Sequence, residues 1–120
     1  DASRDFARRF EAERKAKPTM IHAGTYSAVL HYLRAVRDAG ASDAAAVMAR
    51  MKASRVKDSV FADGYIRADG RMVHDMYLVR VKSPAESKGP WDLYNKLATI
   101  PGDQAFKPMN QGGCPLVAKN

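Results

Sequence analysis

The sequence predicts a mixed α/β chain in which helices come first and strands follow. Two features predict this order. Up to residue 54, apolar residues recur at steps of three and four, which is the period of a helix. After Arg55 the apolar residues alternate instead, and the turn-forming dipeptide Asp-Gly occurs twice, at Asp63-Gly64 and Asp69-Gly70.

The first helix is expected over residues 3–16. Ser3 can cap its start, and Phe6 and Phe10 lie one turn apart on the same face. The next six residues, TMIHAG at positions 19–24, are expected to form a short extended link. This link separates the first helix from the strongest helical pattern in the chain.

That pattern covers residues 25–40. Thr25 is the expected N-cap, and Gly40 supplies the left-handed residue that ends the helix. An apolar stripe runs along one face and consists of Tyr26, Val29, Leu30, Leu33 and Val36. A third helix is expected over residues 42–54, capped by Ser42. The short link between these two helices predicts that they are neighbours in space.

Strands are expected at Tyr65–Arg67 and Met72–Val81. Both faces of the longer strand are mainly apolar, which predicts that it is covered on both sides. The segment WDLYNKLATI, residues 91–100, fits a helix and an extended strand equally well. Few local strands are available as partners, so the sheet is expected to be completed by another part of the protein or by another chain.

His74 and Asp75 are adjacent polar residues inside the long apolar strand. Successive side chains of a strand point to opposite faces, so these two cannot form a catalytic pair or share a metal ion. His22 and His31 lie elsewhere, and the sequence contains no nucleophile motif, phosphate loop or paired carboxylates. We therefore expect no catalytic residue, no metal site and no cofactor.

The charge pattern argues against a nucleic-acid partner. The chain carries 20 Lys and Arg against 13 Asp and Glu, a net charge of +7. Over residues 4–15, however, the charges alternate in sign, which is typical of a solvated helix face. No apolar run approaches the ~20 residues of a membrane helix. The chain opens on Asp1 without a methionine, and we interpret it as a processed or excised piece.

Three blocks of the sequence carry a family resemblance: Thr19–Val29, Asp69–Val81 and Lys88–Phe106. Together they resemble the C-terminal third of the extracellular solute-binding proteins of ABC transporters, of the branched-chain amino-acid (Leu/Ile/Val) type. The similarity extends from about Phe6 to Val117. It implies a periplasmic protein with the two-lobed type I fold, in which each lobe is a parallel sheet flanked by helices and the ligand lies in the cleft between the lobes.

The resemblance also divides the chain and locates a site. Residues 1–74 would be the closing part of the first lobe, and residues 75–120 would cross over and return to the second lobe, with His74 and Asp75 near the hinge. The ligand-binding residues carried over by position are Ile21, His22, Ala23 and Tyr26. Where the Leu/Ile/Val binders place a bulky aromatic residue near this link, the sequence has MIHAG, which puts branched-chain amino acids in doubt. Tyr26 also fits a core position, and His22 also fits a plain surface position.

The implied function is capture of a small solute, an amino acid or a related carboxylate, and its delivery to the membrane permease of an ABC transporter, without catalysis. The implied partners are the solute, the permease and the remainder of the same protein. Alternatives are a ligand-sensing regulatory domain of the same fold, a binder of aromatic acids, and an unrelated small enzyme or nucleic-acid binder. In an oxidising periplasm, Cys114 is expected to pair with a cysteine outside this chain or to be buried.

Overall fold

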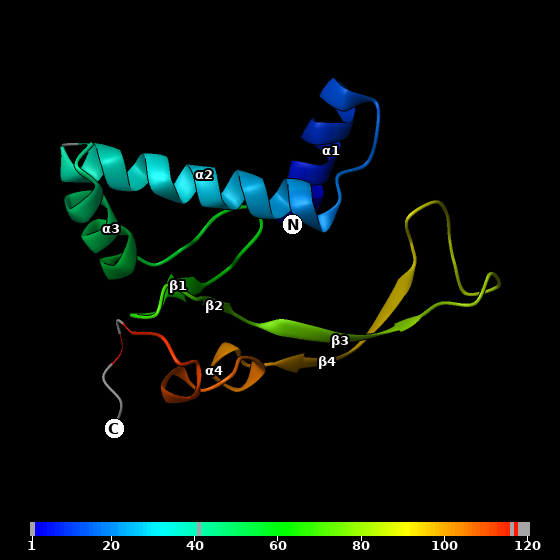
Figure 1. Ribbon diagram of the computed structural model, residues 1–120. Coiled ribbons are helices and arrows are strands. Elements are labelled where there is room, and N and C mark those ends of the chain that lie inside the picture. The colour runs from blue at the N-terminus through cyan, green and yellow to red at the C-terminus, as the bar shows by residue number, and fades with distance from the viewer. Residues whose placement is uncertain (1, 41, 116, 118–120) are drawn as a thin grey trace.

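The computed structural model describes residues 2–40, 42–115 and 117. Three helices come first: α1 (Ala2–Arg14), α2 (Met20–Ala39) and α3 (Ala44–Ala53). Four strands follow, β1 (Gly64–Ile66), β2 (Met72–His74), β3 (Met76–Val81) and β4 (Tyr94–Ile100), and then the short helix α4 (Gly102–Ala105) and a 3₁₀ turn at Met109–Gln111 (Figure 1). The predicted order of helices before strands is confirmed.

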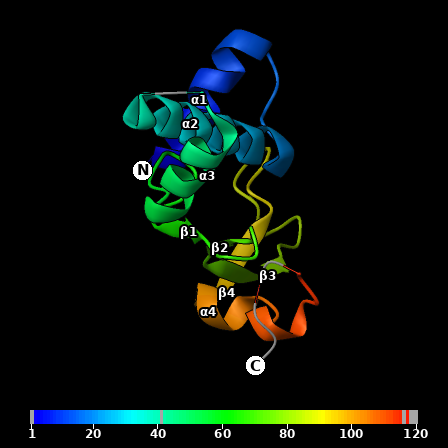
Figure 2. The same ribbon diagram turned by 60° about the vertical axis from the view of Figure 1, so that its left-hand side comes forward.

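The strands form two separate two-stranded sheets. In one, β1 pairs with β2, and in the other β3 pairs with β4; both pairs are antiparallel. The long helices lie on one side of β1 and β2, with α3 against β1, while α4 packs on β2 from the other side (Figures 1 and 2). The parallel pairing that the family resemblance implies would therefore need strands from outside these two hairpins.

The chain is more extended than a self-contained domain of its length. Its Cα radius of gyration is 17.3 Å, whereas a compact domain of this length has about 14 Å. The excess comes from the antiparallel pair of β3 and β4, here called the β3–β4 ribbon, which projects away from the helices (Figure 1). Most of the side chains along this ribbon are exposed, including large apolar ones. The expectation that the long strand is covered on both sides is therefore not met by contacts within this chain.

The long predicted strand Met72–Val81 is broken at Asp75. β2 ends at His74 in the first sheet, and β3 begins at Met76 in the second. The chain thus changes sheets at the polar pair that interrupts its apolar pattern. The segment 91–100, left open by its pattern, is extended over Tyr94–Ile100 and returns along β3, with Met76 opposite Ile100.

The start of α2 corrects the prediction of an extended link. The helix begins at Met20 and is capped by Thr19, not by Thr25, so residues 20–24 form its first turn and a half. The N–H of Thr19 donates to Nδ1 of His22, 3.0 Å away, which is the backward half of a capping box. A histidine takes the place that Glu or Gln usually holds, which is why the pattern does not announce this start. The predicted end is confirmed, with Gly40 at φ 64°.

Three smaller expectations also need correction. α1 begins by Ala2, so Ser3 lies within its first turn and is not its cap. α3 is capped by Asp43, whose Oδ1 accepts from the N–H of Ala46 at 2.9 Å, and not by Ser42. Gly64 is the first residue of β1 and not part of a turn. Its lack of a side chain matters there, because a Cβ would lie 3.1 Å from the backbone oxygen of Val73.

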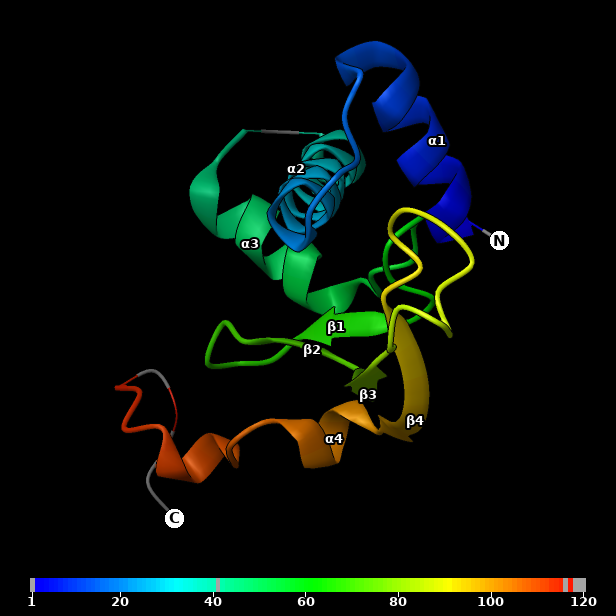
Figure 3. The ribbon, with the colours of Figure 1, turned by 90° about the vertical axis from the view of Figure 1, so that its right-hand side faces the viewer.

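The buried face of α2 is not its predicted apolar stripe. Its buried residues are Ser27, His31 and Ala35, which lie four residues apart along one face. The Nε2 atom of His31 lies 3.0 Å from the backbone oxygen of Met51 in α3. Two of these three residues, Ser27 and Ala35, are small, and α3 packs beside α2, as Figure 3 shows in the view along α2. Of the stripe, Val29 and Leu33 are exposed, at 51% and 56%, whereas Tyr26, Leu30 and Val36 are half-buried.

Candidate functional site

The four residues predicted to bind a ligand lie in the first two turns of α2. Ile21 is 73% exposed and is free to contact a solute. His22 is exposed too, but its Nδ1 caps the helix and its ring lies 4.8 Å from the ring of Phe10. The Tyr26 ring packs on Phe6 of α1, with 4.9 Å between the ring centroids. Of the four residues, Ile21 therefore has the most side-chain surface available for a solute.

Ala23 lies at the edge of a small hollow between α1 and the start of α2. The hollow has a volume of about 240 Å³, and Met20, Pro18 and Val60 also line it. Ile21, His22 and Tyr26 do not line it. The predicted residues thus form one surface at the N-terminus of α2 and do not close around one cavity within the described part of the chain.

A larger hollow lies where the chain passes between its two sheets, and we call it the crossing hollow. Its volume is about 640 Å³, and its lining includes Phe61, Tyr65, Asp75, Tyr77 and Gly102. None of the four predicted ligand-binding residues lines it. Its walls come from segments that lie far apart in the sequence, from Arg55 to Asp103, so no local motif could have located it.

One ion pair forms part of the wall of the crossing hollow. The guanidinium of Arg55 donates to the carboxylate of Asp63, with 2.9 Å between Nε and Oδ1, and it lies 4.9 Å from the centroid of the Tyr65 ring. This hydrogen bond holds the pKa of Asp63 below its ordinary value. The hollow is therefore bounded by aromatic rings, by this charge pair and by two further acidic residues, Asp75 and Asp103.

His74 and Asp75 make separate contacts at the point where β2 gives way to β3. Nδ1 of His74 lies 2.8 Å from the backbone oxygen of Asp75, and its ring lies between those of Phe61 and Phe106. The carboxylate of Asp75 accepts from the N–H of Gly102 at 3.0 Å. The two side chains are engaged with different partners, so they do not work as an acid–base pair.

Three further observations bear on the chemistry that the sequence predicts. Within residues 2–40, 42–115 and 117, no group of three or more His, Cys, Asp or Glu side chains is placed to hold a metal ion. Cys114 is a free, partly exposed thiol, and it is the one cysteine of the sequence. A pairing partner would have to lie outside this chain, so the disulfide remains a prediction. Among the described helices, none combines the length and the hydropathy that a membrane span requires.

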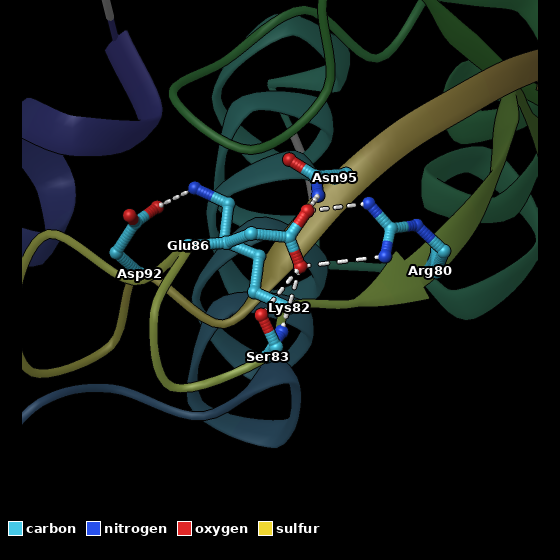
Figure 4. A network of polar contacts seen from close by, with 6 residues as sticks. All are labelled: Arg80, Lys82, Ser83, Glu86, Asp92 and Asn95. Carbon is cyan, nitrogen blue, oxygen red and sulfur yellow. Dashed lines mark hydrogen bonds and ion pairs between the residues drawn. The ribbon is translucent and has the colours of Figure 1, made fainter.

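A network of charged side chains closes the far end of the β3–β4 ribbon (Figure 4). Both carboxylate oxygens of Glu86 accept hydrogen bonds: Oε1 from Arg80 at 2.6 Å and Oε2 from the backbone N–H of Ser83 at 2.8 Å. The Nζ of Lys82 donates to Asp92 at 2.6 Å across the same loop. The hydrogen bonds from Arg80 and Ser83 lower the pKa of Glu86 to about 2.

Acid is expected to loosen this loop as the pH falls toward the lowered pKa of Glu86. The folded pKa of Glu86, about 2, lies below its ordinary value of 4.5, so its hydrogen bonds stabilise the loop fully above pH 4.5 and lose this effect as the pH falls toward 2. Amide hydrogen exchange of residues 82–93, relative to that of α2, should therefore accelerate over this interval. Glu86→Gln should remove most of the pH dependence, and Glu13→Gln on the exposed face of α1 should leave it unchanged. Equal pH dependence in both variants would contradict this assignment.

The described fold defines the class of protein: a mixed α/β segment whose chain passes between two separate sheets, with hollows at the crossing and beside the first helix. A family profile described as periplasmic binding protein matches residues 1–90. The chain belongs to this family of periplasmic binding proteins. No curated protein matched the chain.

Two crystal structures are closely similar to the chain. One is a periplasmic binding protein from Burkholderia mallei, with 48% identity and a TM-score of 0.92. The other is a branched-chain amino acid ABC transporter periplasmic ligand-binding protein from Burkholderia xenovorans LB400, with 45% identity and a TM-score of 0.90. Each match covers 97% of this chain and 31% of the other protein. The fold is thus part of a type I periplasmic-binding-protein fold, and the chain spans about a third of the length of these relatives.

Proposed function

We propose that the chain is the closing part of a two-lobed solute-binding protein that serves an ABC uptake transporter. One observation carries the proposal: nearly the whole chain, 97% of it, matches the structure of a branched-chain amino acid ABC transporter periplasmic ligand-binding protein at 45% identity. In this proposal the protein works in the periplasm, catalyses no reaction, captures a small solute between its lobes and passes it to a membrane permease.

The division of the chain between lobes is part of the same proposal. Residues 1–74 would close the first lobe, and residues 75–120 would cross to the second lobe and return. The change of sheet at Asp75 and the projection of the β3–β4 ribbon away from the helices support this boundary. The apolar side chains left exposed on the ribbon and on α2 also support it, because the remainder of the protein would cover them.

The solute is proposed to be an amino acid or a related carboxylate that meets the N-terminus of α2. Ile21 would supply apolar contact, and the three residues His22, Ala23 and Tyr26 would shape the surface around it. The exposure of Ile21 favours direct contact, whereas the packing of Tyr26 on Phe6 favours a supporting role. An aromatic acid is a specific alternative, because the sequence MIHAG leaves more space here than a bulky aromatic residue would.

A ligand panel tests this proposal in the complete protein. Leucine, isoleucine and valine form one arm, benzoate and 4-hydroxybenzoate the second, and glucose the negative control. Binding of one arm should raise the melting temperature, since a ligand at 100 times its Kd adds about 2.7 kcal/mol to the free energy of unfolding. Failure of every amino acid and carboxylate to bind, or their chemical conversion, would contradict the proposal.

Substitutions on α2 then test the proposed site. Ile21→Asp should weaken binding of the identified solute about tenfold or more, the equivalent of 1.4 kcal/mol. Ala28→Asp is the matched control, because residue 28 lies two turns further along the same helix face, about 10 Å away. Calorimetric titration of both variants separates the two results. Equal affinities would place the solute away from Ile21.

The alternative role as a sensor of the same fold differs in its partners. A transporter protein should restore solute uptake to cells that lack its gene, whereas a sensor should change gene expression or signalling without affecting uptake. A signal peptide upstream of this segment would favour the transporter protein. A fused helix-turn-helix, kinase or transmembrane segment would favour the sensor.

A further inference from the structure

The chain leaves the β1–β2 sheet for the β3–β4 ribbon and later returns to pack on β2, and these two passages touch each other. The outgoing passage is at Asp75, between β2 and β3. The returning passage is at Pro101 and Gly102, where β4 ends and α4 begins. They lie together because β4 pairs with β3 up to its last residue, Ile100 opposite Met76, and because α4 then packs on β2.

Two features fasten the passages to each other. The carboxylate Oδ1 of Asp75 accepts a hydrogen bond from the N–H of Gly102 at 3.0 Å. The backbones are also in direct contact, since a Cβ on Gly102 would lie 2.9 Å from both the carbonyl carbon and the oxygen of His74. That distance is shorter than real Cβ contacts, and backbone atoms cannot turn aside as the end of a flexible side chain can. Glycine is therefore required here for close approach, since a side chain would push the passages apart.

The side chain of His74 contacts the segments on both sides of this crossing. His74 directs Nδ1 to the backbone oxygen of Asp75, and its ring is held between Phe61, which precedes β1, and Phe106, which follows α4. The segments before and after the crossing are thus joined through one imidazole. Asp75 itself is exposed, so the hydrogen bond to Gly102 forms at the surface of the crossing and can be removed without opening the core.

We propose that Asp75 and Gly102 form a clasp that binds the outgoing and returning passages into one joint, so that the two bodies of the protein move about this joint along a single path. Two passages that bend independently allow the bodies to twist and shear as well as to close. Two passages fastened side by side leave mainly one bending motion. This inference rests on the proposed function, because the two bodies belong to the lobes of the proposed binding protein.

Loss of the clasp is expected to widen the range of orientations between the lobes of the solute-free protein. Asp75→Ala removes the acceptor, whereas Asp75→Asn keeps an accepting oxygen at the same place and is the matched control. Gly102→Ala keeps the N–H but forces a methyl group against the backbone of His74. Asp75→Ala and Gly102→Ala should therefore act alike, and Asp75→Asn should resemble the unchanged protein.

The test is the distribution of distances between two spin labels in the complete, solute-free protein. Cysteines that replace Ala45 in α3 and Lys88 in the ribbon loop carry the labels. In the background, Cys114 and any cysteine that pairs with it are replaced by serine. The proposal expects a broader distribution for Asp75→Ala and Gly102→Ala than for Asp75→Asn. Amide exchange at Gly102 should also rise about tenfold in Asp75→Ala, the factor for one lost hydrogen bond of ordinary strength to a charged group.

Each outcome decides the proposal. An unchanged distribution in Asp75→Ala overturns it, even if Gly102→Ala fails to fold, because Asp75 is exposed and its loss leaves the core intact. Equal broadening in Asp75→Ala and Asp75→Asn also overturns it, since the accepting oxygen would then not matter. The measurement needs no solute, so a failure to find a solute would contradict the proposed function while leaving the clasp supported.

Discussion

Replacing Phe6 with alanine is expected to lower the free energy of unfolding of the complete protein by about 3 kcal/mol. Phe6 is 8% exposed and is the buried residue of α1 among those that the structure describes. Its ring packs on Tyr26 of α2, 4.9 Å between centroids, and on Phe10, 6.2 Å away. Truncation would remove the anchor of α1 and would leave Tyr26 free to change its orientation.

Phe10→Ala is the matched control for this substitution. It removes the same side chain one turn further along α1, but Phe10 is only half-buried and packs mainly on the exposed His22 ring. We expect about half the loss of stability seen for Phe6→Ala, because less apolar surface returns to water. Chemical denaturation followed by circular dichroism measures both variants. A larger loss for Phe10→Ala than for Phe6→Ala would show that α1 is anchored differently.

The sequence predicts those parts of this fold that are stabilised by local interactions. The end of α2 at Gly40 follows from the left-handed conformation that glycine adopts freely, and Asp69-Gly70 forms its turn for the same reason, with Gly70 at φ 83°. The start of α2 was not predictable in this way. Its capping residue, Thr19, is paired with a histidine, so the familiar pattern of an acidic residue or glutamine at the third position is absent.

Which residues are buried depends on contacts between distant segments and with the remainder of the protein, and local sequence patterns do not specify these contacts. The apolar stripe of α2 predicts a buried face, yet the fully buried residues are Ser27, His31 and Ala35, because α3 packs beside α2 and the backbone of Met51 contacts His31. The exposed part of the stripe, Val29 and Leu33, lies on the side of α2 away from α3. In the proposed two-lobed protein another segment would cover it. Periodicity identifies apolar faces, but it does not show which neighbour covers each one.

The candidate site, like the fold, could be predicted only in part from the sequence. The position of Ile21, His22, Ala23 and Tyr26 came from family resemblance, and their assignment to ligand binding remains a prediction. The crossing hollow could not be predicted, because its lining is assembled from the segment at residues 55–65, the break at Asp75 and the start of α4. The apolar run around His74 and Asp75 did contain one useful signal. A polar pair inside an apolar strand marks the residue at which the chain changes sheets.

Replacing Leu78 with aspartate is expected to destabilise the complete protein by about 4 kcal/mol, even though Leu78 is 53% exposed in this chain. An exposed position normally tolerates such a change within about 0.5 kcal/mol. Here both faces of the β3–β4 ribbon carry large apolar side chains, including Tyr77 and Val79 beside Leu78. In the proposed two-lobed protein the remaining sequence covers this ribbon, and a buried charge without a partner would be costly.

Ala85→Asp in the loop at the end of the ribbon is the control for this prediction. Ala85 is exposed and lies seven residues from Leu78, in the polar loop that Glu86 organises, so an added charge there stays in water. Denaturation of the two variants should differ by several kcal/mol. If Leu78→Asp were as mild as Ala85→Asp, the ribbon would be exposed to water in the complete protein as well. The remainder of the protein would then not pack against β3, and residues 75–120 would not form part of a second lobe.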